Sequence, residues 1–149
     1  MKKKASAYLK DNTLIIETRG YTEQEFSVSA HQVCFLEANA APQEIGIAVI
    51  KALEDFQTDI PQPRDAADWR LRQKEWCKAM GVKSWKGFAN GAKSIDIATE
   101  DELATIKIIP NLFSKKDSSF EQITEKSRTC PGEAEALGKT ILEAFEDCE

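Results

Sequence analysis

The sequence predicts an α+β domain in which helices pack on a mostly antiparallel sheet. Short stretches that alternate apolar and polar residues, as half-buried strands do, occur in the first and last thirds of the chain. Longer segments with apolar residues at helical spacing follow each group of strands. Strands grouped together and followed by helices are typical of the α+β class. The 149 residues, 42% of them apolar, are enough for one domain with its own core.

The first strands are predicted over 5–10 and 13–18. Asp11-Asn12 between them is a two-residue sequence of the kind that closes a tight hairpin. Apolar and polar residues alternate over 26–30 and again over 33–35, which predicts a second hairpin before the first helix.

The first helix is predicted to begin at Pro42, because proline suits the first helical turn, whose N–H groups have no partner inside the helix. Apolar residues follow at the spacing of one helix face: Ile45, Val49, Ala52, Leu53 and Phe56. The segment 57–63 is predicted to be a connector, in which Pro61 and Pro63 prevent the helix from continuing. This connector is too short to separate two folded domains.

A second helix is predicted over 65–80, closed by the glycine that follows it. Trp69, Trp76 and Met80 have the spacing of a buried stripe, which leaves the basic residues of this segment on the solvated sides of the helix. A shorter helix, capped by a serine and closed by Asn-Gly, is predicted over 84–90.

The last third of the chain predicts a hairpin, a loop, a strand and a helix. The hairpin has strands over 93–99 and 103–109 around an acidic turn, and Pro110 ends the second strand. A polar loop over 111–119 and a short strand over 120–124 come next. The last helix, predicted over 133–147, has the apolar stripe Leu137, Ile141, Ala144, Phe145 and Cys148.

One segment of the chain occurs twice. Residues 44–55 and 136–147 align without gaps. Their identical positions are Gly46 and Gly138, Ala52 and Ala144, Glu54 and Glu146, and Asp55 and Asp147. Two copies this far apart do not make a solenoid, which needs at least three shorter repeats. We therefore expect a single domain, 1–149, with two related halves of about 1–60 and 82–149 joined by a helical segment over 61–81.

Gly46 and Gly138 occupy the same place in the two copies. A glycine inside a helix costs ~1 kcal/mol relative to alanine, so its presence needs a reason. Either a ligand touches the backbone there, or the helix closely approaches another helix or the sheet. The repetition favours close packing, because a duplicated scaffold repeats its packing constraints.

The net charge of −5 argues against a general nucleic-acid binder and suits a protein whose partner is basic, such as a nuclease. The charge is uneven, since 64–93 holds eight basic and three acidic residues. Two acidic groups are predicted to be exposed and to bind the partner. They are Glu23 and Glu25 before a strand, and Glu100, Asp101 and Glu102 in a turn. Ordinary solvated turn charge is the alternative interpretation.

The sequence predicts a cytoplasmic protein that does not enter a membrane. Its four cysteines lack Cys-x-x-Cys spacing, which favours free thiols in a reducing compartment: Cys34, Cys77, Cys130 and Cys148. The lysine-rich start resembles the flank of a signal peptide, but no apolar run of about 7–15 residues follows it. No stretch approaches the ~18 apolar residues of a membrane span.

No group of residues predicts catalysis, a cofactor or a metal site. Phosphate-binding glycine motifs and the Gly-x-Ser-x-Gly elbow do not occur. His31 and Cys34 lie three residues apart, so a small enzyme with a Cys–His pair, or half of a metal site, is one alternative. A partly buried histidine beside a core cysteine is the simpler interpretation.

A small nucleic-acid-binding regulatory protein is another alternative. The segment 64–86 mixes basic residues with three tryptophans, a combination in which aromatic rings stack on bases and cations bind phosphates. The residues concerned are Trp69, Arg70, Arg72, Trp76 and Lys78.

Several motifs together resemble one known family. They are Met80-Gly81-Val82-Lys83-Ser84-Trp85-Lys86-Gly87-Phe88, Gly91-Ala92-Lys93-Ser94-Ile95, Ile106-Lys107-Ile108-Ile109-Pro110, and Leu137-Gly138 with its helix. Over residues 70–147 the chain is similar to the immunity proteins of bacterial contact-dependent growth inhibition, the CdiI type. Residues 1–60 match this family loosely, through the Ile45-Gly46 helix.

The resemblance implies a non-enzymatic cytoplasmic protein that binds the C-terminal toxin domain of a CdiA-type effector. Many such toxins are nucleases, and neutralisation would cover the active-site cleft or a neighbouring surface. The family has no catalytic residues to transfer, and its toxin-facing residues vary with the toxin. The resemblance therefore implies a partner without identifying the residues that contact it.

Overall fold

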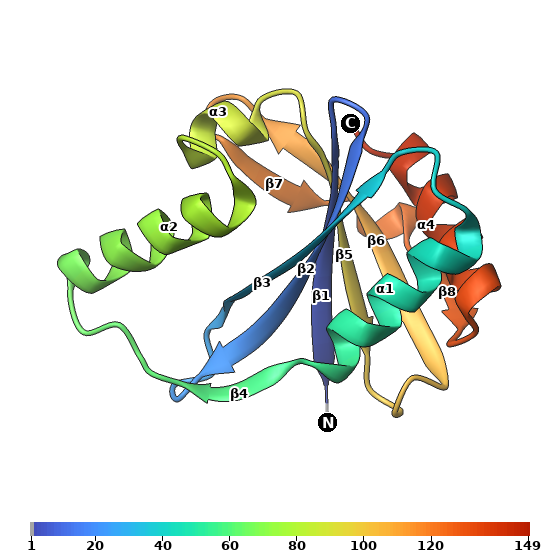
Figure 1. Cartoon of the computed structure of the whole chain (residues 1–149), viewed down its shortest axis with the longest axis horizontal. Helices are drawn as coiled ribbons and strands as arrows, with labels where there is room; N and C mark the ends of the chain where they lie inside the picture. Colours follow the sequence, from blue (N-terminus) through green and yellow to red (C-terminus); the bar gives the residue numbers. More distant parts are fainter. Residues whose placement is uncertain (1) are drawn as a thin grey trace.

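The computed structural model describes residues 2–149, which form an eight-stranded, mostly antiparallel sheet with helices on both faces (Figure 1). The order along the sheet is β3-β2-β1-β5-β6-β7, with β4 paired to β2 and β8 paired to β6. The strands are β1 (Lys3–Lys10), β2 (Thr13–Thr22), β3 (Ser27–Glu37), β4 (Gln57–Ile60), β5 (Lys93–Thr99), β6 (Thr105–Ser114), β7 (Ser119–Gln122) and β8 (Arg128–Pro131). The helices are α1 (Pro42–Glu54), α2 (Ala66–Met80), α3 (Trp85–Ala89), α4 (Ala134–Glu146) and a 3-10 turn (Thr124–Lys126). The predicted α+β class is confirmed.

The predicted β1–β2 hairpin is confirmed. Asp11 and Asn12 have φ angles of 50° and 64°, the left-handed conformation that a tight two-residue turn requires. Lys10 pairs with Thr13 directly across this turn. On its other side β1 pairs with β5, so the two strands lie together in the middle of the sheet.

The predicted second hairpin is wrong, because β3 is one strand with an irregularity in its middle. Val33 pairs with Glu17 of β2 and Ser29 pairs with Arg19, so three residues of β3 lie opposite one residue of β2. His31 within this bulge has a φ of 61°. A bulge shifts the apolar–polar alternation just as a turn does, which explains the wrong prediction.

β6 continues through Pro110, although the sequence predicted that this proline ends the strand and begins a loop. Pro110 lies between the part of β6 that pairs with β8 and the part that pairs with β7. Its carbonyl accepts a hydrogen bond from the Ile123 N–H at 2.9 Å. No residue of β7 or β8 pairs with Pro110 on this side of β6. The N–H that proline lacks therefore removes no hydrogen bond between strands.

The sequence did not predict β4 and β8. Each strand is four residues long, which is too short for an alternating pattern to stand out. β4 lies inside the predicted connector over 57–63 and pairs in parallel with β2.

α1 and α4 lie on one face of the sheet and contact each other at the two repeated glycines (Figure 1). A Cβ atom on Gly46 would lie 1.8 Å from the carbonyl oxygen of Ala134, and one on Gly138 would lie 1.8 Å from that of Pro42. The close approach predicted from these glycines is confirmed. At Gly46 the backbone of α1 lies against that of α4, and at Gly138 the backbone of α4 lies against that of α1. The relation between the halves 1–60 and 82–149 stays a prediction.

The main core lies between the sheet and these two helices. Its largest fully buried side chains include Leu14, Ile16, Ile45, Leu53, Ile95, Ile97, Ile106, Ile108, Leu137 and Ile141. A smaller cluster lies on the opposite face, under α2 and α3, and consists of Tyr8, Ile15, Trp76, Met80, Phe88 and Ala92. Because α2 and α3 cover only part of that face, the rest of it stays open.

The cysteines are free thiols, as predicted. Within residues 2–149, no helix combines the length and the apolar character that a membrane crossing requires.

Candidate functional site

α2 lies over the sheet face opposite α1 and α4, and its C-terminal half anchors it there (Figure 1). Asp65 caps the helix by accepting a hydrogen bond from the Asp68 N–H at 2.9 Å. Gly81 ends the helix in the left-handed conformation, with a φ of 71°. Trp76 and Met80 are its buried residues, and the predicted bounds of the helix are confirmed.

Trp69 does not belong to the buried stripe that its spacing predicted, because the N-terminal half of α2 stands away from the sheet (Figure 1). The Trp69 side chain is 42% exposed. It packs edge to face against Phe26, with ring centres 6.3 Å apart and planes at 86°. Phe26 is itself 52% exposed and precedes β3, so the half-buried strand position predicted for it is wrong.

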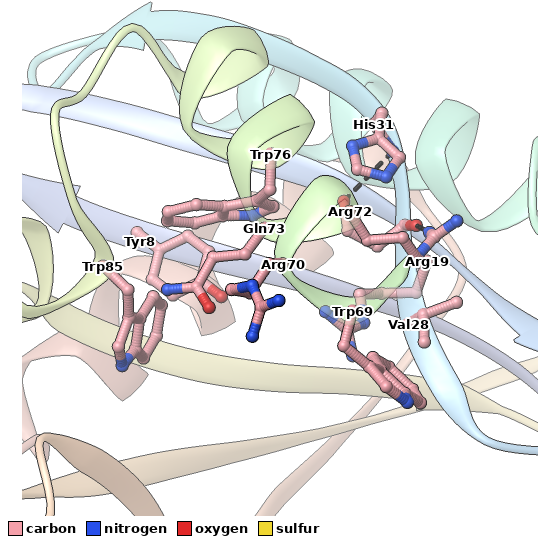
Figure 2. A pocket seen from close by; sticks show the side chains of 11 residues that line it. Tyr8, Arg19, Val28, His31, Trp69, Arg70, Arg72, Gln73, Trp76 and Trp85 are labelled. Carbon is pink, nitrogen blue, oxygen red and sulfur yellow. Dashed lines mark hydrogen bonds between the residues drawn. The ribbon is translucent and has the colours of Figure 1, made fainter. Parts of the chain in front are cut away.

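A groove of about 420 Å³ lies between α2 and strands β1–β3, and we call it the α2 groove (Figure 2). The strands contribute Tyr8, Arg19, Val28, Ser29 and His31, and the helices contribute Trp69, Arg70, Arg72, Gln73, Trp76 and Trp85. Aromatic rings and three guanidinium groups therefore share one concave surface. Such a lining suits a group that is partly apolar and carries negative charge.

A buried hydrogen-bond network supports this groove from the sheet side. The Glu17 carboxylate is fully buried and accepts a hydrogen bond from Trp76 Nε1 at 2.6 Å. It also pairs with Arg19 at 3.2 Å, and Arg19 donates to Ser27 Oγ at 3.2 Å. Arg19 and Trp76 are thereby held in fixed orientations on opposite walls of the groove.

Arg72 and His31 lie together near the bulge of β3 (Figure 2). Arg72 donates a hydrogen bond from Nη2 to the carbonyl oxygen of Ser29 at 2.5 Å. Burial lowers the pKa of His31, and the nearby Arg72 charge lowers it further. His31 is therefore a neutral imidazole at pH 7, and the cations of the groove are its arginines.

His31 and Cys34 do not form the catalytic pair considered from the sequence. Both imidazole nitrogens of His31 are buried without a hydrogen-bond partner among the described residues, whereas Cys34 is exposed. A nucleophile and its base must lie within hydrogen-bond reach of one another. In the described part of the chain, no group of three or more His, Cys, Asp and Glu side chains could hold a metal ion.

A second hollow, of about 400 Å³, lies on the open part of the same sheet face, and we call it the sheet recess. Its cations are Lys2, Lys4, Arg19 and Lys107. Its one carboxylate, Asp96, accepts a hydrogen bond from Gln122 Nε2 at 2.8 Å. Because Arg19 lines both hollows, the sheet recess and the α2 groove are parts of one surface.

Sequence reasoning missed the sheet recess. Lys2 and Lys4 alternate along the chain, and that spacing alone indicates that they share a sheet face. Lys107 joins them only through strand pairing, since it lies opposite Ala98, which in turn lies opposite Lys4. No local signal in the sequence brings these positions together.

The five acidic residues predicted to bind a partner are all exposed. They lie in two loops at the same end of the sheet: Glu23 and Glu25 between β2 and β3, and Glu100, Asp101 and Glu102 between β5 and β6 (Figure 1). The start of β1 lies between these loops (Figure 1). Its Lys3 pairs with Glu102 at 3.7 Å. The structure therefore separates the acidic residues into two groups.

Two of these carboxylates also hold their loops in shape. Glu23 accepts a hydrogen bond from the Gln62 N–H at 3.2 Å, which ties the β2–β3 loop to the segment after β4. Asp101 accepts hydrogen bonds from the Thr105 N–H at 2.9 Å and from Thr99 Oγ1 at 3.1 Å. These contacts give the acidic loops a defined geometry.

The Asp101→Asn variant is expected to lose stability in a pH-dependent way. The hydrogen bond from the Thr105 N–H lowers the pKa of Asp101 in the folded protein. A lowered pKa stabilises the fold above the unfolded value of about 3.9, and this contribution disappears as the pH falls through the folded-state pKa. The urea midpoint of the variant should lie below that of the wild type at pH 7, and the difference should shrink on acidification.

Glu100→Gln is the matched control for Asp101→Asn, because Glu100 makes no side-chain hydrogen bond or ion pair to the residues described by the structure. Its urea midpoint should follow that of the wild type from pH 7 to about pH 3. An Asp101→Asn midpoint that stays a constant distance below the wild type at every pH would contradict the linkage.

Comparisons with known proteins agree with one another. A family model described as CdiI, CDI immunity protein, matches residues 3–148. The fold is similar to that of a protein of unknown function, NMB0488, from Neisseria meningitidis, with a TM-score of 0.83 and 20% identity over 100% of this chain and 96% of that one. It is also similar to a chain in a CdiA-CT/CdiI toxin and immunity complex from Yersinia pseudotuberculosis, with a TM-score of 0.79 and 16% identity over 100% of this chain and 98% of that one. A search of curated proteins found no match.

Proposed function

Since this chain belongs to the CdiI family of CDI immunity proteins, we propose that it binds and neutralises the C-terminal toxin domain of a CdiA-type effector. The family match, which covers residues 3–148, is the observation that carries the proposal. A similar fold occurs in a toxin and immunity complex from Yersinia pseudotuberculosis, which supports the same partner class. Inhibition of this kind takes place by binding and needs no chemical step.

We further propose that the protein acts in the cytoplasm on a basic toxin, a nuclease being the class expected from charge. A nuclease must hold phosphates and therefore presents cations. Glu23, Glu25, Glu100, Asp101 and Glu102 project from one end of the sheet and are the acidic residues proposed to meet them. Charges of this kind at the edge of an interface mainly raise the rate of association.

Co-expression with the toxin domain encoded beside this gene tests the proposal. Cells that express the toxin alone should die, and cells that also express this protein should grow. Purified toxin and immunity protein should form a stable complex in size-exclusion chromatography. Continued killing with this protein in excess, together with no complex, would overturn the proposed function.

The acidic loops have a test of their own. Glu100→Lys combined with Glu102→Lys should slow toxin association roughly 10-fold at low salt, measured by stopped-flow fluorescence. Glu44→Lys combined with Glu54→Lys makes the same charge change on α1, outside these loops, and should leave the association rate unchanged. Equal rates for both variants would remove these loops from the interface.

Nucleic-acid binding is the second candidate function, because Trp69 is exposed beside Arg70 and Arg72 in the α2 groove. Exposed aromatic and cationic side chains together suit single-stranded nucleic acid. This function predicts a gel shift with RNA or DNA at low ionic strength that falls steeply with salt. Absence of any shift would eliminate it.

A further inference from the structure

We propose that the toxin binds at the centre of the open sheet face of this protein. The toxin contributes an acidic segment that carries a large apolar side chain. The apolar side chain enters the α2 groove, and carboxylates of the segment meet the cations around it. This proposal rests on the proposed function, because it assumes that the partner is the toxin. It identifies the face that binds and the chemistry that the toxin presents there.

The charge of this face is opposite to that of the whole chain. Six cations line the α2 groove and the sheet recess, and we call them the cationic face: Lys2, Lys4, Arg19, Arg70, Arg72 and Lys107. The one carboxylate that lines either hollow is Asp96. The chain as a whole has a net charge of −5, so this positive surface is local and distinct.

Most of these cations have no acidic partner of their own. Among the described residues, Arg19 is the one member of the cationic face that forms an ion pair, and its partner is the buried Glu17. Surface lysines of this protein do pair elsewhere, as Lys51 does with Asp55 and Lys126 with Glu149. The other cations of the cationic face form no ion pair among the described residues, so they are available to a partner's carboxylates.

The α2 groove supplies the apolar contact. Trp69 and Phe26 are large aromatic side chains that remain 42% and 52% exposed at its edge. Exposed aromatic residues beside a concave site are the type that carries much of the energy of protein interfaces. A volume of about 420 Å³ is enough to accept a large side chain of the partner.

Two of the three guanidinium groups in the groove are oriented before any partner binds. Arg19 is held by Glu17 and Ser27, and Arg72 by the Ser29 carbonyl. Fixing these side chains in the free protein reduces the conformational entropy lost on binding. An arginine held in this way can offer its remaining N–H donors to a carboxylate in a planar, two-bond contact.

The surroundings of the cationic face favour a folded protein over a nucleic acid. The acidic β2–β3 and β5–β6 loops flank the start of β1, where Lys2 and Lys4 lie (Figure 1). A continuous polyanion crossing the face would pass close to these five carboxylates and be repelled. A protein surface with localised carboxylates at its centre and cations at its edge would complement both regions.

Affinity measurements by isothermal titration calorimetry with the purified cognate toxin domain test this inference. Lys4→Glu combined with Lys107→Glu should weaken binding roughly 30-fold or more, and so should Trp69→Ala. Lys51→Glu combined with Lys139→Glu is the matched control, since these exposed lysines of α1 and α4 lie on the opposite face, and it should change the affinity less than about 3-fold. Lys51, Trp69, Lys107 and Lys139 are exposed and Lys4 is half-buried, so every variant should keep the far-UV circular dichroism spectrum of the wild type.

The outcomes separate the two proposals. Loss of toxin affinity in both the Lys4→Glu/Lys107→Glu variant and the Trp69→Ala variant, but not in the control, supports docking on this face. If the toxin binds both variants as tightly as it binds the wild type, the docking inference is overturned and the immunity function stands. No binding of the wild type overturns the proposed function itself. A single-stranded oligonucleotide that binds the wild type and loses affinity in the variants, while the toxin does not, assigns the face to nucleic acid and also overturns the inference.

Discussion

The Gly46→Ala variant is expected to be less stable than the wild type by about 2–4 kcal/mol, although alanine inside a helix normally stabilises it by ~1 kcal/mol. The added Cβ would lie 1.8 Å from the carbonyl oxygen of Ala134, so α1 and α4 must move apart. Both helices also pack on the sheet, and the shift would open gaps in the main core. Urea unfolding followed by circular dichroism measures the change.

The same argument predicts how a second change should behave. Gly138→Ala places a Cβ 1.8 Å from the carbonyl oxygen of Pro42, so it should destabilise the protein by a similar amount. The two glycines meet in one helix contact, and once the helices have separated, the second methyl group has less to displace. The double variant should therefore lose clearly less stability than the sum of the single losses.

Gly87→Ala in α3 is the control for these variants. Its Cβ would meet only the Ser84 hydroxyl oxygen, at 3.1 Å, and a side chain can give way where a helix backbone cannot. The free energy of unfolding should change by less than about 1 kcal/mol. A Gly46→Ala protein as stable as the wild type would show that the helices do not make this backbone contact.

Replacing Trp76 is expected to have the second large effect. Trp76→Ala should cost about 3–5 kcal/mol, because it removes a buried aromatic side chain. The ring packs edge to face on Trp85 and Phe88, with ring centres 5.3 Å and 5.6 Å apart, so neighbouring rings lose their contacts as well. Chemical denaturation at pH 7 measures the loss.

Trp76→Phe separates packing from hydrogen bonding. Phenylalanine keeps an aromatic ring but has no N–H to donate to the buried Glu17 carboxylate, which then retains Arg19 as its partner. Leaving part of a buried carboxylate unsatisfied costs about 1–3 kcal/mol.

Trp69→Ala on the exposed half of α2 is the control and should cost less than about 1 kcal/mol. Equal stability of Trp76→Phe and the wild type would mean that the Trp76–Glu17 hydrogen bond contributes nothing.

Local signals in the sequence predicted those elements whose causes are local. Asp11-Asn12 predicted a turn because both residues tolerate a positive φ, and the structure has that turn. Gly81 predicted the C-terminal end of α2, because the left-handed turn that ends a helix depends on the residue at that position. The repeated Gly46 and Gly138 predicted close packing, although the partner of each helix became clear only in three dimensions.

Where the prediction failed, a distant part of the chain was responsible. Pro110 stays inside β6 because β7 and β8 divide that edge of the sheet between them, which no window around the proline can reveal. Trp69 has the spacing of a buried residue, yet its half of α2 stands away from the sheet. The bulge at His31 imitates a turn, since both interrupt the alternation of side chains.

The sequence by itself determined the α+β class, the first hairpin, the main helices and the resemblance to an immunity family, because periodicity, caps, turns and motifs are properties of short stretches. Only the tertiary structure decided where the charges gather. Lys4, Arg19, Arg70 and Lys107 come from three strands and a helix, and strand pairing together with the position of α2 brings them to one face. Electrostatic fields add in space and not along the chain, so an acidic protein can carry a positive binding face that its sequence does not reveal.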